Sequence, residues 1–326
     1  RVVIQYSPTE LFKAGSDIRK AHNFFNKNFA GVTGLNVVLE SDKGNAFKTP
    51  ELLEKMNVLQ MKITEHNQVG KAVSIADYIK RMNFVMHDED ESYNRIPQTV
   101  EKVTDFEWVE VDGKEIVREK EAEVTGHDQI SQYLLLYEGA GGRDLSKVID
   151  DKYKEANINV FLKTDNSATN RDIIRTIRMH CKEIFTKNIS VSFSGVSTLF
   201  IDLADMIIKG QLWSIAISIG IVFIMIVLMI RSPLLGIIGV LPVIFTVLCN
   251  FAIMKCFSVP LDVGTALVSS VTIGIGVDYC IHYLTWATDE RRKGSALNEA
   301  AKKALSGVGK PVMLNALVVA AGFLVL

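Results

Sequence analysis

Asp278 lies deep inside a long apolar stretch of the sequence, with Tyr279 next to it and His282 four residues further on. Placing an Asp at the centre of a membrane helix costs about 2.5–3.5 kcal/mol, and such residues usually face a bundle interior or a water-filled path. In a low-dielectric setting a carboxyl group favours its protonated form unless a cation or a chain of waters compensates. This pattern is that of a proton carrier, which loads from one side of a membrane and releases to the other.

The residues near Asp278 have side chains that suit the same proton chemistry. Tyr279 adds a hydroxyl next to it, and His282 lies one helical turn further on the same face, nearer the cytoplasm. Gly274 and Gly276 remove side-chain bulk, so that another helix can approach or the backbone can flex. The alternatives are an acid that only pins helix packing and an interfacial histidine near a helix end.

The elements that must hold these residues are closely spaced membrane-spanning helices. Residues 212–230 are an uncharged stretch about as long as a spanning helix requires, roughly 20 residues. Further spans are expected at about 234–254, 261–284 and 311–326, the last one truncated, because the chain stops inside an apolar run. Pro242 predicts a kink rather than an end of the second span, since neighbouring helices can satisfy the freed carbonyl. Residues 295–308 predict a short amphipathic helix on the inner membrane surface, as a connector or as a regulatory partner site.

The loops predict the orientation of these spans. The segment between the third and fourth spans carries six basic residues: Arg291, Arg292, Lys293, Lys302, Lys303 and Lys310. The turn at Arg231 lies on the same side, whereas the opposite turn has only Lys255. Positive loops stay in the cytoplasm, so we expect residues 1–206 to lie outside it, in a multi-pass membrane protein.

Charge divides the chain in the same way, into an extracytoplasmic porter-like domain at 1–206 and a transmembrane domain at 207–326. From residue 207 onward there are nine Lys/Arg and five Asp/Glu, a net of +4; the first part has 27 and 32, a net of −5. An acidic region with no basic stripe argues against nucleic acid as a partner. The four cysteines show neither a disulfide framework nor the paired spacing of a zinc or redox site.

The first domain predicts an α+β fold with two ferredoxin-like β-α-β units. The first unit is expected as a strand at 2–6, a helix at about 10–29 and a strand at 35–39; the second has a strand at 157–162, a helix at 170–187 and a strand at 189–193. A further helix follows each unit, one opening at 49–51 with a proline in its first turn and one at 198–209 that leads into the membrane. We expect a pair of small subdomains, with residues 88–123 as a hairpin or mobile loop between them.

The sequence resembles the resistance–nodulation–division (RND) superfamily, particularly the exporters of the mycobacterial membrane protein large (MMPL) group. Patched and the Niemann–Pick sterol transporter are more distant relatives. The most specific stretch is Gly-Ile-Gly-Val-Asp-Tyr at 274–279; residues 231–233, 73–77 and 132–137 add to it. Such proteins have two similar halves, each with one membrane helix, a large outer domain and five further helices. The resemblance implies that this chain is a fragment of one half, from just after its first helix to its fifth. It also implies that the protein lies in the bacterial inner membrane.

The resemblance also implies a function. It is proton-driven export of hydrophobic or lipid-like molecules, with Asp278 and Tyr279 in the proton relay and the proton motive force in place of a cofactor. The expected partners are membrane lipids, a hydrophobic substrate, and the second half of the protein or another protomer. One alternative is a protein-export accessory like the Sec D/F pair; another is a lipid-sensing, receptor-like protein that does not pump. An enzyme is not expected, because no nucleophile, base and orienting group occur together in the sequence.

Overall fold

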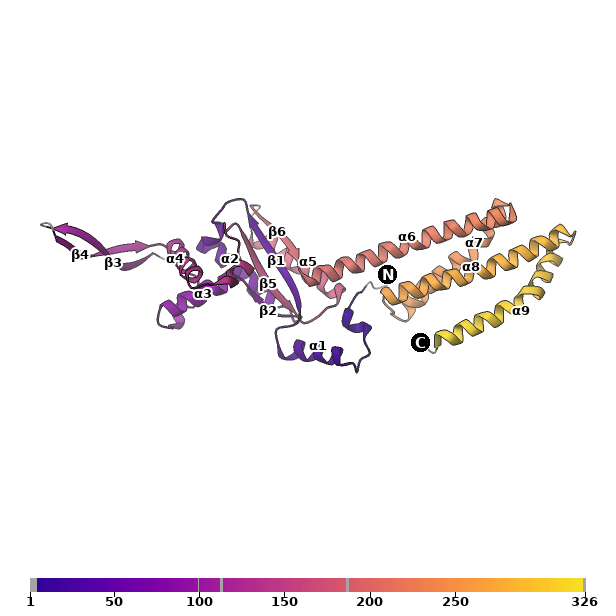
Figure 1. The fold of residues 1–326 in the computed structure, drawn as a ribbon, viewed down its shortest axis with the longest axis horizontal. Helices are drawn as coiled ribbons and strands as arrows, with labels where there is room; N and C mark the ends of the chain where they lie inside the picture. Colours follow the sequence, from indigo (N-terminus) through magenta and orange to yellow (C-terminus); the bar gives the residue numbers. More distant parts are fainter. Residues whose placement is uncertain (1–4, 99, 112–113, 186–187, 325–326) are drawn as a thin grey trace. The chain divides into compact units, whose positions relative to one another are not determined.

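The computed structural model describes residues 5–98, 100–111, 114–185 and 188–324 (Figure 1). The chain divides into two compact units. Ser7–Asp202 form the α+β unit, and Leu203–Leu326 form the helical unit together with Arg1–Tyr6. Helix α6 (Val196–Ile230) runs without a break through the boundary that we expected at 206/207.

The α+β unit contains five helices and six strands among its described residues. In chain order these are α1 (Asp17–Asn28), β1 (Thr33–Ser41), α2 (Pro50–Thr64), β2 (Val69–Val73), α3 (Ile75–Met86), β3 (Glu101–Val111), β4 (Lys114–Val124), α4 (Gly126–Gly139), β5 (Glu155–Leu162), α5 (Ser167–Ile184) and β6 (Ile189–Ser194). Short 3-10 helices lie at Pro8–Leu11, Ala46–Lys48, Glu91–Tyr93 and Arg143–Lys147.

The main sheet has four strands in the order β2-β5-β1-β6, and every neighbouring pair is antiparallel. Val37 on β1 lies opposite Ile158 on β5 and Phe193 on β6. The two β-α-β units are β1-α2-β2 and β5-α5-β6, and each unit places one of its strands between the two strands of the other. This is the ferredoxin-like arrangement. The predicted α+β class is confirmed, but the two units share one sheet, so the expectation of two separate subdomains is wrong.

The first β-α-β unit also begins later in the chain than we predicted. Residues 2–4 of the expected strand lie outside the described residues, and Gln5 and Tyr6 are not in a strand. The helix expected at 10–29 is α1, which belongs to neither unit. Strand β2 was not predicted, because Gly70 and Lys71 weaken its strand pattern. In the structure a Cβ atom at Gly70 would overlap the carbonyl group of Ala30, so this position needs a glycine.

Local signals set several element ends as expected. Pro50 opens α2 at its first turn, although the hydroxyl of Thr49 donates to the Ala46 carbonyl (2.6 Å) instead of capping the helix. Within residues 88–123, β3 and β4 pair along their whole length as a hairpin, as predicted. Helices α3 and α4 each begin with a capping box, which sequence reasoning missed.

One hydrophobic core holds the α+β unit together. Strand β1 alternates buried and half-buried residues and contributes Leu35, Val37 and Leu39 to it. Helix α2 adds Leu53 and Met56 at helical spacing. The sheet therefore buries one face against helices, which is the two-layer solution expected for this class.

The helical unit consists of the membrane portion of α6, then α7 (Pro233–Cys256), α8 (Val263–Arg292) and α9 (Leu297–Leu324). Each is long and apolar enough to cross a membrane. The spans expected at 212–230 and 234–254 lie within α6 and α7, and all of the third but residues 261–262 lies within α8.

Helix α9 corrects one detail, because it joins residues 297–308 to the fourth span without the break that we expected. Pro311 lies inside this helix, where it cannot donate to the carbonyl of Gly307. Figure 1 shows α9 bent along its length, as an interior proline permits.

Candidate functional site

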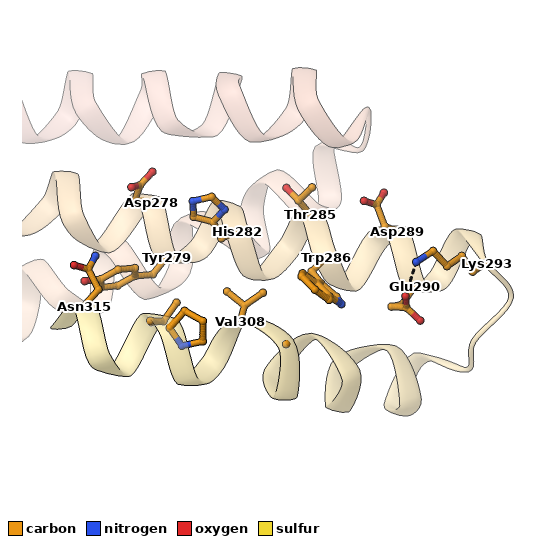
Figure 2. Close-up of a pocket in the computed structure, with 13 residues that line it drawn as sticks. Asp278, Tyr279, His282, Thr285, Trp286, Asp289, Glu290, Lys293, Val308 and Asn315 are labelled. Carbon is orange, nitrogen blue, oxygen red and sulfur yellow. Dashed lines mark hydrogen bonds and ion pairs between the residues drawn. The ribbon is translucent and has the colours of Figure 1, made fainter. Parts of the chain in front are cut away.

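The predicted proton-carrying residues lie in the middle part of α8, against a cavity that this helix shares with α9. The cavity has a volume of about 640 Å³, and Asp278, Tyr279 and His282 all line it (Figure 2). Helix α8 ends at Arg292 and α9 begins at Leu297, so the two helices are joined by a short connection. The cavity therefore lies within the helical unit.

Two further polar residues extend the predicted set along the same helix. Thr285 and Asp289 follow Asp278 and His282 at spacings of three and four residues, which places all four on one face of α8. All four line the cavity. Figure 2 shows Asp278, Thr285 and Asp289 projecting to the same side of α8. Sequence reasoning stopped at His282, although the periodicity that reveals this polar stripe was present in the sequence.

Tyr279 points another way. Figure 2 shows its ring directed toward α9, as is that of Trp286, and Asn315 of α9 lines the same cavity. The Tyr279 hydroxyl is buried and has no hydrogen-bond partner within the described chain. A buried hydroxyl without a partner costs free energy, and such an atom calls for an explanation in terms of water, function or a partner. Asn315 could not be found from sequence, because nothing in the chain before folding brings α9 to α8.

Charged groups close the cavity at the end where α8 meets α9. The carboxylate of Glu290 accepts a hydrogen bond from the Lys293 ammonium (2.7 Å) and pairs with Lys303 of α9 (3.4 Å). The hydrogen bond to Glu290 raises the pKa of Lys293 above its usual value. These contacts tie the two helices together beside the mouth of the cavity.

Asp278 and His282 are both exposed in the chain as described. They line the open cavity instead of packing among the four helices of this unit. Any element that encloses them, or any water that fills the cavity, must come from outside the described residues. Their role in a relay stays a prediction.

The two predicted glycines, Gly274 and Gly276, do not lie at close helix contacts within the described chain. A Cβ atom at Gly274 or Gly276 would meet nothing within 4 Å among the described residues. Close helix contacts instead occur at Gly236, where a Cβ would overlap Val227 of α6, and at Gly307, where it would meet the Trp286 ring.

Pro242 lies inside α7, and the Thr246 hydroxyl donates to its carbonyl (2.8 Å). The helix continues on both sides of it, in agreement with the expectation that this proline does not end the span. Across the described ranges, no group of three or more His, Cys, Asp or Glu side chains could hold a metal ion.

Three comparisons relate large parts of this chain to known proteins. The model of the MMPL family matches residues 25–326. A putative membrane protein of Methanocaldococcus jannaschii is 27% identical over 186 residues, which are 55% of this chain and 47% of that protein. A crystal structure described as a heavy metal efflux pump is similar with a TM-score of 0.50 and 13% identity over 87% of this chain and 29% of that one. At this identity the likeness shows the fold alone. The chain spans about half the length of the curated relative and less than a third of the pump chain.

Proposed function

We propose, from the premise that this chain belongs to the MMPL family, that it is part of a proton-driven secondary transporter in which Asp278 carries the proton. The observation that carries this proposal is the position of Asp278. It lies near the middle of a candidate span and lines a cavity with other polar side chains. A carboxyl at such a place is costly, by about 2.5–3.5 kcal/mol at a helix centre, and is usually functional.

The cavity supplies a path for the proton. The stripe of Asp278, His282, Thr285 and Asp289 leads along α8 from the middle of the span toward the charged end at Glu290. Waters in a cavity of about 640 Å³ can connect these groups by hydrogen bonds. Protonation of Asp278 removes its charge, and this change shifts the balance between two packings of the helices. The Tyr279 hydroxyl, which has no partner in the described chain, is free to bind the carboxyl or a water in one of these packings.

Other parts of the proposal concern the whole protein. The substrate is a hydrophobic or lipid-like molecule. The basic residues at the end of α8, in the connection and in the first half of α9 lie in the cytoplasm of a bacterial cell, and the α+β unit lies outside it. The exposed Asp278 and the open surroundings of Gly274 support a role for a second half of the protein or another protomer, which would cover this face of α8.

The test is Asp278→Asn in the full-length protein, reconstituted in liposomes that contain a pH-sensitive dye. We expect proton flux driven by an imposed membrane potential to fall to the level of protein-free liposomes, because an amide cannot load and release a proton. Glu299→Gln is the matched control, since this carboxylate is exposed in the first turn of α9 and does not line the cavity. It should retain most of the flux.

Unaltered flux in the Asp278→Asn protein would remove this acid from the mechanism. Mass spectrometry of lipids that copurify with the intact protein then tests the substrate class. Cross-linking of the α+β unit to unfolded polypeptide would favour the protein-export accessory instead, and ligand-dependent signalling without proton flux would favour the sensor.

A further inference from the structure

Helix α1 turns its polar side toward the protein and its apolar side outward. The side chains of Arg19, His22 and Asn26 share one face of the helix and are half-buried. On the adjoining side Ile18 is 53% exposed and Phe25 45% exposed. No residue of α1 is buried. A surface helix of a soluble protein shows the reverse arrangement, with its apolar stripe against the core.

The outward side of α1 carries a compact group of aromatic rings. The ring centroid of Phe24 lies 5.8 Å from that of Phe25 and 6.2 Å from that of Phe29, and the centroids of Phe25 and Phe29 are 5.3 Å apart. Phe24 and Phe29 are each 58% exposed. We call Ile18, Phe24, Phe25 and Phe29 the aromatic face. A contiguous exposed apolar patch of this kind marks an interaction site for a protein or a membrane.

Polar contacts on the inner side hold α1 in this orientation. Asn26 accepts a hydrogen bond from the Val32 amide (3.3 Å), and the Arg19 guanidinium donates to the Phe12 carbonyl (3.2 Å). Arg19, His22 and Asn26 line a polar cavity of about 430 Å³, together with the buried Asp165. The polar face of α1 is therefore the one that borders this cavity, and the aromatic face does not line it.

The segment before α1 is fixed to the same cavity. One carboxylate oxygen of Asp165 accepts the Ser7 hydroxyl (2.7 Å), and the other accepts the amide (2.9 Å) and hydroxyl (2.8 Å) of Thr9. Tyr6, directly before Ser7, already belongs to the helical unit, and ten residues separate it from Asp17 at the start of α1. Ten residues reach at most about 35 Å. Chain connectivity therefore limits the distance between the start of α1 and Tyr6.

Charge distinguishes this segment from the rest of its unit. Residues 10–29 contain four basic residues, Lys13, Arg19, Lys20 and Lys27, and two acidic ones, Glu10 and Asp17, a net of +2. Residues 1–206 as a whole have a net charge of −5. An amphipathic helix with basic residues on one side and Phe on the other matches the requirements of a bilayer interface.

We propose that α1 lies in the bilayer interface on the side of the α+β unit, with its aromatic face at the boundary between headgroups and acyl chains. A second copy of the chain fits this face less well, because it would bring two basic segments together. Phe side chains would enter the membrane by about 5–10 Å, while Lys20 and Lys27 remain at the level of anionic headgroups.

The test places a tryptophan on the aromatic face of the full-length protein in nanodiscs of phosphatidylcholine and phosphatidylglycerol. Phe25→Trp is the probe. Leu135→Trp, on α4, is the matched control, because Leu135 is 70% exposed and either substitution adds a ring to an open position. Subtracting the fluorescence of the parent protein removes the signal of Trp108, Trp213 and Trp286. With lipids brominated near the top of their acyl chains, we expect loss of most of the added fluorescence at position 25 and none at position 135.

Two results would overturn the proposal. One is an added fluorescence at position 25 that bromolipids leave unchanged. The other is a quenched signal that appears only when each disc holds two copies of the protein, which would show a contact between copies. A charge-reversed protein, Lys20→Glu with Lys27→Glu, should lose part of the quenching in discs with phosphatidylglycerol and none in discs of phosphatidylcholine alone. None of these measurements depends on proton flux, so they stand apart from the test of Asp278.

Discussion

The two units of this chain bury apolar side chains to very different extents. The α+β unit has one core that links β1, β5, α2 and α5, and many of its large side chains are fully buried. The helical unit has three small clusters instead. Only 22% of the apolar window of α6 and of α7 is buried, and this share falls to 12% in α8 and 6% in α9. The α+β unit is stabilised by its own packing, whereas the four helices depend on lipid or on other protein segments for most of their contacts.

Buried polar groups extend the comparison. In the α+β unit, Asn83 donates to two backbone carbonyls and accepts the Tyr133 hydroxyl (3.0 Å). In the helical unit, the Tyr279 hydroxyl and the Gln211 side-chain nitrogen are buried without partners among the described residues. The α+β unit also has such groups: the side-chain oxygen of Asn157 and both polar side-chain atoms of Asn170 are buried and have no partner within the described ranges. Buried polar atoms without a described partner therefore occur in both units, and each of them calls for water or another segment as its partner.

The largest effect is expected from Phe47→Ala in the core of the α+β unit. Phe47 is fully buried, and truncation of such a side chain leaves a cavity and costs about 3–5 kcal/mol. Pulse proteolysis of the full chain in nanodiscs, across a urea series, measures the free energy of unfolding of this unit. Leu135→Ala, at a 70% exposed position, is the control and should change it little. Equal losses in the two variants would contradict the assignment of the core.

A second pair of variants compares the polar groups. Asn83→Leu removes the hydrogen bonds to the Tyr133 hydroxyl and to the Tyr93 and Arg95 carbonyls. Each such bond contributes about 0.5–1.5 kcal/mol, so the free energy of unfolding of the α+β unit should fall. Tyr279→Phe removes a hydroxyl that has no partner in the described chain, and so it should not lower the thermal stability of the helical unit. It should lower proton flux if the hydroxyl belongs to the relay. A clear loss of stability in Tyr279→Phe would show that the hydroxyl is bonded in the native protein.

A third pair compares two glycines in the membrane helices. A valine at Gly307 would collide with the Trp286 ring, and overpacking of this kind costs about 1–3 kcal/mol. A valine at Gly274 would meet no atom of the described chain. Thermal unfolding in nanodiscs should therefore separate the two variants. Destabilisation by Gly274→Val in the full-length protein, with none in this chain alone, would show that another segment packs against α8 at this point.

Sequence patterns predicted those parts of the fold that depend on local chemistry. Long apolar runs predicted both ends of α7, the end of α6 and the start of α8 to within about two residues, because the membrane requires a minimum length. They did not predict that α6 begins at Val196 or that α8 continues to Arg292. The interleaving of β1 and β5 could not be predicted, since strand alternation shows which face is buried but not which strand is the neighbour. The break expected before Pro311 was wrong because a membrane helix can continue through a proline.

The residues of the candidate site that lie on α8 could be predicted from the sequence, but those that depend on helix packing could not. Asp278, Tyr279 and His282 could be found, since they are polar residues within one apolar stretch. Asn315 and the cavity between α8 and α9 depend on which helices pack together, and the sequence of α8 does not contain that information. The inverted orientation of α1 was also missed, because an amphipathic pattern does not show which side faces the protein.

The smallest effect concerns two cysteines, one in each unit. Cys181 on α5 is 2% exposed, and burial raises the pKa of its thiol to about 11. Cys256 at the end of α7 is exposed. In a chain that carries Cys249→Ser and Cys280→Ser, a charged maleimide at pH 8 should alkylate Cys256 readily and reach Cys181 only after denaturation, because the thiolate is the reactive form.

The same pKa shift makes a pH-dependent contribution to stability. The folded state holds the Cys181 proton more tightly than the unfolded state, in which the thiol has its ordinary pKa of 9.0. This contribution is fully present below pH 9.0 and is lost as the pH rises through the folded value of about 11. The free energy of unfolding of the α+β unit should therefore fall less steeply between pH 8 and pH 11 in Cys181→Ala than in the parent chain. Parallel pH profiles, or alkylation of Cys181 as fast as that of Cys256, would mean that α5 opens readily and that the core of this unit is less closed than its packing indicates.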